Sequence, residues 1–164
     1  MKAEYTDVLF LDGQEIPGTR KEVDLPFRRI SARAMIVRRS DGAILGTLHR
    51  QGGQYALPGG ALEDGESTLE TARRELAEEK ISLIAPEWMQ DVAVDFYSGY
   101  CELSVWHLVV VEDAQIGDTE ENIESRWIKQ DEDVWYPSMH ENLILALNRF
   151  LPELAKASTS VTAL

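Results

Sequence analysis

Five charged residues in the middle of the chain fall at spacings that suit joint chemistry, the last four of them within one predicted helix: Glu66, Arg74, Glu75, Glu78 and Glu79. Residues three and four positions apart share one face of an α-helix, so the glutamates at 75, 78 and 79 project within an arc of about 100°. Like charges this close repel one another, and a hard divalent cation such as Mg²⁺, which takes oxygen ligands, neutralises them. The spacing indicates a cation site; the alternative is a solvated acidic face on a surface helix.

Two neighbouring features favour the cation site. Arg74 stands among the acids, where its guanidinium group can hold Glu66 or a neighbouring carboxylate in a bidentate contact. The segment Leu57-Pro58-Gly59-Gly60 precedes the helix, and glycines let backbone groups approach a ligand or a metal closely. We therefore expect a loop and a helix to frame the site together.

The surrounding sequence predicts one helix here and a series of strands around it. An apolar stripe without Gly or Pro predicts a helix from Ser67 to Lys80. A last helix is expected from about Ser138 to Leu151. Apolar, β-favouring runs predict strands at 30–37, 43–48, around Tyr55, and at 90–97, 102–111 and 126–128.

The N-terminal residues 4–24 are predicted to form a hairpin. Its strands would be Val8–Leu11 and Lys21–Leu25, with a turn at Asp12-Gly13, and it would add to an edge of the core. No repeat or linker interrupts residues 1–156, and residues 157–164 are expected to form a disordered tail. The pattern predicts a single mixed α/β domain.

Composition restricts the partners and the compartment. The 164 residues include 16 Lys+Arg and 29 Asp+Glu, a net charge of −13 that argues against binding a nucleic-acid polymer through a basic surface. Cys101 is the only cysteine, which excludes an internal disulfide and fits a reducing, cytoplasmic compartment. No apolar run approaches the roughly 20 residues that span a bilayer, so no membrane association is expected.

The central residues carry a family resemblance. The run Gly60, Glu66, Arg74-Glu75-Leu76, Glu78-Glu79 resembles the Nudix box, G-x5-E-x7-R-E-U-x-E-E-x-G-U, in which U is a bulky apolar residue. The lead-in before Gly60 and the order of strands are similar to the family's too. The final Gly-U of the box is Ile81-Ser82 here. Since a β-branched residue avoids the left-handed turn that the glycine supplies, we expect a differently shaped helix exit.

The resemblance implies both a fold and an activity. The fold is a Nudix-type α/β/α sandwich with a mixed central sheet, to which the N-terminal β-hairpin is an addition. The activity is Mg²⁺-dependent hydrolysis, with Mn²⁺ as a substitute, of a pyrophosphate bond in a nucleoside triphosphate or a nucleoside diphosphate derivative. Water would attack phosphorus. The partner implied is a small phosphorylated molecule, and a homodimer is allowed.

The resemblance also implies roles for single residues. Glu66 would pair with Arg74 to hold loop and helix together, and Glu75 and Glu78 would be catalytic. The implied metal ligands are the Gly60 carbonyl, Glu75, Glu78 and Glu79.

A catalytic base or extra ligand is implied in the acidic loop 118–124, ahead of a strand that contains Trp127. Glu121 is slightly favoured, with Glu120 and Glu124 as alternatives. A solvated acidic loop is the competing interpretation.

Four further residues are candidates for substrate binding. Arg50 precedes the Gly-Gly loop and suits a phosphate, whereas Trp135 and Tyr136 present rings that can stack on a nucleobase. The two aromatic residues are equally suited to packing. His140 is a candidate for reading the base, or else a surface or capping residue.

Two other functions compete with hydrolysis. The N-terminal hairpin resembles that of isopentenyl-diphosphate isomerases, which share the fold and use a catalytic cysteine on an early core segment, whereas Cys101 follows the box. A non-catalytic nucleotide sensor or scaffold would most simply lack box glutamates, and all of them are present.

Overall fold

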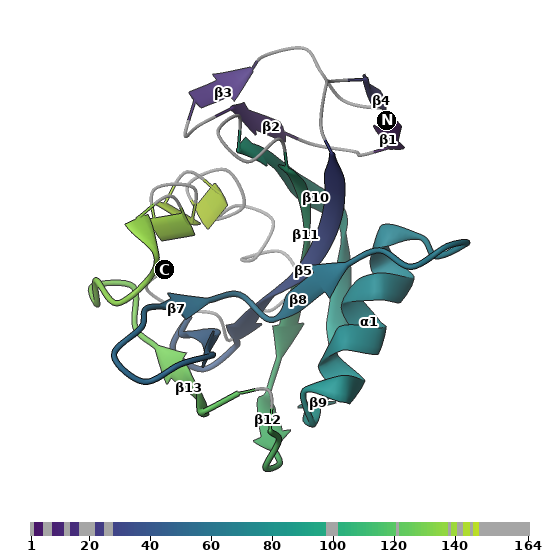
Figure 1. Cartoon of the computed structure of the whole chain (residues 1–164). Coiled ribbons are helices and arrows are strands. Elements are labelled where there is room, and N and C mark those ends of the chain that lie inside the picture. The colour runs from purple at the N-terminus through teal and green to yellow at the C-terminus, as the bar shows by residue number, and fades with distance from the viewer. Residues whose placement is uncertain are drawn as a thin grey trace.

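The structure is a computed structural model that describes residues 2–4, 8–11, 14–16, 22–24, 28–97, 102–120, 122–137, 139–140, 143–144 and 146–147. Its first half contains β1 (Lys2–Glu4), β2 (Val8–Leu11), β3 (Gln14–Ile16), β4 (Glu22–Asp24), β5 (Arg29–Arg38), β6 (Ile44–Leu48), β7 (Tyr55–Ala56) and β8 (Gly59–Ala61). The remaining elements are α1 (Thr68–Glu78), β9 (Ile81–Ile84), β10 (Glu87–Tyr97), β11 (Glu102–Val111), β12 (Asp113–Ile116) and β13 (Glu124–Ile128) (Figure 1).

One large mixed sheet organises the molecule. Its strands follow the order β13-β6-β5-β11-β10-β2-β3, with β7 paired to β6 and β8 paired to β5. The pairs β5–β11 and β10–β2 are parallel, and the other pairs in the sheet are antiparallel. Two small antiparallel pairs, β1–β4 and β12–β9, lie apart from it. The mixed sheet confirms the predicted fold class.

The central strands β5 and β11 are buried on both faces, because apolar residues occupy successive positions along each of them. Helix α1 covers one face, and the helical residues between 137 and 147 cover the other (Figure 1). The α1 face includes Ala34, Ile36, Val109 and Val111 packed with Leu76, and the opposite face includes Met35, Val37, Trp106 and Leu108 packed with Leu143 and Leu147. The layers are helix, sheet and helix.

The expected last helix, Ser138–Leu151, is confirmed where the structure describes it. Residues 137, 139, 140, 143, 144, 146 and 147 are helical. The remainder of that prediction, the predicted tail 157–164 and Cys101 lie outside the described residues. No helix in the described ranges is both long and apolar enough to cross a membrane.

The N-terminal hairpin differs from its prediction in its second strand. The register pairs Leu11 with Gln14, so the return strand is β3 and follows after only two residues. The predicted return strand at 21–25 overlaps β4, which pairs with β1 instead. Since β2 joins β10, the hairpin extends an edge of the sheet as expected. A two-residue Asp-Gly connection favours such an immediate return, which the prediction of a longer loop overlooked.

The start of α1 is fixed at its cap and to the sheet. The Ser67 hydroxyl accepts a hydrogen bond from the backbone N–H of Glu70 at 3.1 Å, as an N-cap residue does. The Thr68 hydroxyl lies 2.8 Å from Nε2 of His107 on β11. Burial, aided by the positive charge of Arg73, lowers the pKa of His107 to about 4, so its ring is neutral at neutral pH and can accept from Thr68.

The exit of α1 differs from the box pattern, as expected. Lys80 takes the left-handed conformation with φ of 60°, one position before the residue that replaces the box glycine. Its carbonyl accepts a hydrogen bond from the N–H of Gly117 at 2.8 Å. Ile81 then begins β9 with its side chain buried against Leu76. The early turn spares the β-branched residue a positive φ and places it in the core.

Replacing Lys80 with glycine is predicted to stabilise the protein. A residue with a Cβ costs roughly 1–2 kcal/mol in the left-handed conformation. Glycine avoids this cost but loses roughly 0.5–1 kcal/mol of stability, because its unfolded chain has more conformational entropy. We expect Lys80→Gly to raise the free energy of unfolding by up to about 1 kcal/mol, measured as a higher urea midpoint at constant slope. Lys80→Ala removes the same side chain but keeps the Cβ. Equal stability of the two variants would contradict strain at this turn.

Candidate functional site

The guanidinium group of Arg74 lies at the centre of the predicted site. Its Nε and Nη2 donate to Oε2 and Oε1 of Glu66 at 2.7 and 3.0 Å, a bidentate pair. Its Nη1 donates to Oε1 of Glu75 at 3.0 Å and to Oε1 of Glu78 at 3.1 Å. One arginine thus contacts three of the predicted carboxylates.

Glu66 ties the loop after β8 to the helix. Its Oε1 also accepts from the backbone N–H of Glu63 at 2.9 Å and from the hydroxyl of Thr71 at 3.0 Å, while Arg74 donates to the Ala61 carbonyl at 3.0 Å. The hydrogen bonds from Arg74 and then from the Glu63 N–H lower the pKa of Glu66 to about 2. Its carboxyl therefore stays ionised at neutral pH and keeps loop and helix together.

The backbone of Gly60 lies against the carboxylate of Glu75. It pairs with Ala32 of β5, and a Cβ built on it would stand 2.3 Å from Oε1 of Glu75. No L-residue with a side chain fits without moving this carboxylate. The absence of a side chain at Gly60 therefore brings a helix carboxylate against the backbone of β8, as the motif predicts.

Glu78 and Glu79 stand at the end of the helix in different surroundings. The Glu78 side chain is 46% exposed, whereas Glu79 is only 2% exposed, an uncommon degree of burial for a carboxylate. Carboxylate and carbonyl oxygens suit Mg²⁺ chemically. In the conformation observed, no group of three or more His, Cys, Asp or Glu side chains within the described ranges is placed to hold a metal. Arg74, hydrogen-bonded to Glu75 and Glu78, offsets part of their negative charge instead.

The candidates for the catalytic base in the acidic loop lie in different surroundings. Glu121 lies outside the described residues, and Glu120 is exposed. The Tyr55 hydroxyl donates to Oε1 of Glu124 at 2.5 Å, and the Arg126 guanidinium stacks 4.9 Å from the Tyr55 ring. Since Tyr55 belongs to the core on the face opposite α1, Glu124 is bound on the far side of the sheet from the box helix.

The predicted substrate residues lie in different environments. Trp135 is 4% exposed, forms a bridge with Tyr55 and belongs to the core opposite α1. Tyr136 is partly buried against the same core. Nδ1 of His140 lies 3.8 Å from Oδ1 of Asp133. Arg50 is exposed before the glycine turn. The structure thus shows packing for both aromatic residues and leaves their role in binding a prediction.

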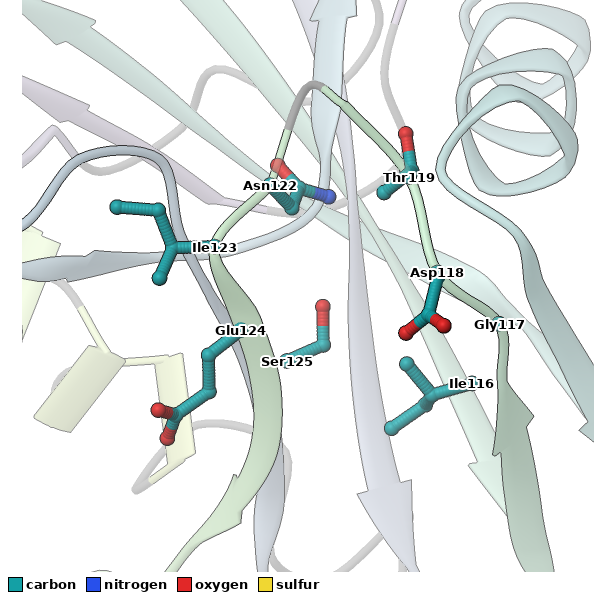
Figure 2. Close-up of a pocket in the computed structure, with 8 residues that line it drawn as sticks. All are labelled: Ile116, Gly117, Asp118, Thr119, Asn122, Ile123, Glu124 and Ser125. Atoms are coloured by element: carbon teal, nitrogen blue, oxygen red, sulfur yellow. The ribbon is translucent and has the colours of Figure 1, made fainter.

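A pocket of about 420 Å³, not predicted from the sequence, lies between the end of β12 and the start of β13 (Figure 2). Residues 116–119 and 122–125 line it. The only signal in the sequence was the acidic loop, which was interpreted as a source of a base and not as the wall of a pocket.

Comparison with known families identifies the chain. The family model for the NUDIX domain matches residues 27–144, most of the sequence. The chain therefore belongs to the NUDIX family, and the predicted Nudix pyrophosphohydrolase is confirmed at the level of family and fold. No curated protein matches it.

Solved structures agree on the fold. A NUDIX hydrolase from Nitrosomonas europaea has a TM-score of 0.60 at 18% identity, over 85% of this chain and 78% of that one. An Ap4A hydrolase from C. elegans has a TM-score of 0.56 at 17% identity, over 77% and 99%. A bifunctional NMN adenylyltransferase/ADP ribose pyrophosphatase from Francisella tularensis has a TM-score of 0.58 at 18% identity, over 80% of this chain. This chain spans only 43% of that enzyme, which has also been solved with AMP and a Mn ion.

The adjacent glycines 59 and 60 are predicted to respond differently to alanine. A Cβ on Gly59 would stand 2.2 Å from the Ala32 carbonyl oxygen, which is backbone and cannot yield, whereas the Cβ on Gly60 meets only the end of the Glu75 side chain. We expect Gly59→Ala to lower the free energy of unfolding by about 2 kcal/mol or more. Gly60→Ala should change it by less than about 1 kcal/mol while moving Glu75 and lowering activity. Urea denaturation and turnover measure the two effects, and a Gly60→Ala protein with full activity would show that the position of Glu75 is unimportant.

Proposed function

We propose that this protein is a Mg²⁺-dependent hydrolase of a pyrophosphate bond in a nucleoside triphosphate or nucleoside diphosphate derivative, with Mn²⁺ as a substitute. One observation carries the proposal: Arg74, held by Glu66, gathers Glu75 and Glu78 on one helix against the Gly60 backbone. The buried Glu79 stands at the end of the same helix. Such a cluster of carboxylates can bind a pyrophosphate only when a cation offsets the negative charge of the cluster.

The residues proposed to hold the cation are Gly60, through its carbonyl, Glu75, Glu78 and Glu79. When bound, Mg²⁺ supplies neutralisation of charge on the phosphate oxygens. Glu78 is the ligand most able to change partner, because its side chain is half exposed and its contact with Arg74 is a single hydrogen bond. Arg74 keeps its bidentate contact with Glu66 in either arrangement, so the helix and loop stay in place.

In the reaction, a water oxygen forms a bond to phosphorus, the bridging P–O bond of the anhydride breaks, and the departing phosphate takes the electron pair. The water gives its proton to a base, for which we propose Glu121. The position of Glu124, the alternative base, supports this choice. Glu124 is hydrogen-bonded to Tyr55 on the face of the sheet opposite the box helix. Arg50, exposed beside the glycine turn, is proposed to contact the substrate phosphate.

The setting is part of the proposal. The single cysteine fits a reducing, cytoplasmic environment. The net charge of −13 favours a small phosphorylated ligand bound through a cation over a nucleic-acid polymer. We also propose that residues 1–156 form a single domain and that the protein can form a homodimer. The isomerase alternative depends on Cys101, which lies outside the described residues.

A non-catalytic scaffold is the second candidate, and one observation favours it. Arg74 already donates hydrogen bonds to Glu75 and Glu78 and offsets part of their negative charge, as it would in a purely structural network. A scaffold of this kind would need no cation, whereas an enzyme would lose its activity if one ligand of its cation were removed.

Glu78→Gln separates the two functions. The variant keeps the size of the side chain but removes a charge that the cation needs, so we expect Mg²⁺-dependent phosphate release to fall by roughly 10²-fold or more. Glu70→Gln is the matched control, because Glu70 is exposed on the first turn of the same helix. Release is measured on ADP-ribose, nucleoside triphosphates, dinucleoside polyphosphates and sugar nucleotides. Undiminished release in Glu78→Gln would overturn the mechanism, and inactivity of the native protein on every substrate would favour the scaffold.

A further inference from the structure

The backbone just before Gly60 crosses from one strand partner to another. Strand β7 pairs with β6, whereas β8 pairs with β5, so Leu57 and Pro58 lie between the two ladders. Leu57 is fully buried and belongs to the core on the face opposite α1. Buried peptide groups in folded proteins are nearly always hydrogen-bonded. The N–H and the carbonyl of Leu57 therefore need partners from outside the two ladders.

Two side chains supply these partners. Nη1 of Arg33 donates to the Leu57 carbonyl at 2.7 Å, and the Leu57 N–H donates to Sδ of Met139 at 3.1 Å. The bond from Arg33 is the stronger of the two, because its donor is charged and a thioether sulfur is a weak acceptor. Arg33 alternates along β5 with Met35, which belongs to the same core as Leu57. The main contact that holds this peptide thus comes from the face opposite α1.

Arg33 also contacts the next part of the segment. It pairs with Gly59 across β5 and β8, and a Cβ built on Gly59 would stand 2.6 Å from Cγ of Arg33. The aliphatic stem of Arg33 therefore passes over Gly59 to reach the Leu57 carbonyl. The N–H of the following residue, Ala34, donates to the Pro58 carbonyl at 2.9 Å. Residues 57–59 are thus held on β5 by Arg33 and its neighbour.

We propose that Arg33 is a positioning residue, which fixes the backbone of residues 57–59 and so places Gly60 against the carboxylate of Glu75. Residues 59 and 60 are both glycine, so the segment has wide conformational freedom and its path must be fixed from outside. The inference rests on the proposed function, because the Gly60 carbonyl is a proposed ligand of the cation. Arg33 acts through the backbone, since Glu75 belongs to α1 on the other face of the sheet.

Arg33→Met tests the proposal, because it removes the donor and keeps an unbranched stem over Gly59. The probe is Mn²⁺ alone, and its affinity for the folded protein is measured from the electron paramagnetic resonance signal of the free ion. We expect the affinity to fall about tenfold, as is usual when a group that supports a metal ligand is removed. Loss of a positive charge would by itself strengthen the binding of a cation. The sign of the change therefore separates positioning from electrostatics.

Two further variants serve as controls. Arg29→Met removes the same charge from the same strand, and because the Arg29 side chain is 53% exposed we expect less than a twofold change in Mn²⁺ affinity. Arg33→Lys keeps a charged donor and should recover most of the affinity. Should Arg33→Met fail to fold, Arg33→Gln, whose side chain is too short to reach the Leu57 carbonyl, takes its place.

A second readout needs no cation. Nuclear Overhauser contacts between the α-protons of Gly60 and the side chain of Glu75 report how closely the two approach. We expect these contacts to weaken in Arg33→Met and to persist in Arg29→Met.

Either of two results overturns the role of Arg33. One is a Mn²⁺ affinity that is unchanged or raised in Arg33→Met, and the other is persistence of the contacts between Gly60 and Glu75 in that variant. A native protein that binds no Mn²⁺ contradicts the cation site of the proposed function instead. In that case the contacts between Gly60 and Glu75 alone decide whether Arg33 positions this backbone.

Discussion

The contact between Arg74 and Glu66 is the constraint on which the site depends. The guanidinium joins the loop after β8 to helix α1 and also reaches Glu75 and Glu78. Without it, the acids of the helix would repel one another, and the loop would have no charged anchor on the helix. The same contact keeps the Gly60 backbone against the Glu75 carboxylate. Charge compensation within the protein thus maintains a cluster whose chemical use requires a cation from outside.

The sheet determines which side of the molecule this cluster serves. Because β5 and β11 are apolar on both faces, α1 packs on one face, and the described residues Met139, Leu143, Ala146 and Leu147 pack on the other. Trp135 and Glu124 belong to the second side, away from the box helix, while Gly117 donates a hydrogen bond to the carbonyl of Lys80, just after the end of α1. The box acids and Glu124 of the acidic loop therefore lie on opposite faces of the sheet.

Much of this was predictable from periodicity and spacing. Strands β5, β6 and β11 follow apolar runs, and the box residues share a face because helical geometry is regular. The short strands β8, β9 and β12 were missed, since their pairing comes from partners distant in the sequence and not from local propensity. The left-handed Lys80 and the hydrogen bonds to the Leu57 peptide depend on tertiary packing, which leaves no pattern in the sequence. Local rules predicted the chemistry, whereas the pocket required the three-dimensional structure.

The central claim is that the box helix binds a divalent cation, and titration of the ¹⁵N-labelled protein with Mn²⁺ tests it most directly. Paramagnetic broadening of the amide signals is expected first at Gly60 and at residues 75–79, and Glu78→Gln should shift it to higher Mn²⁺ concentrations. The account would be contradicted if Gly60 and residues 75–79 were not among the first signals to broaden, or if Glu78→Gln left the titration unchanged.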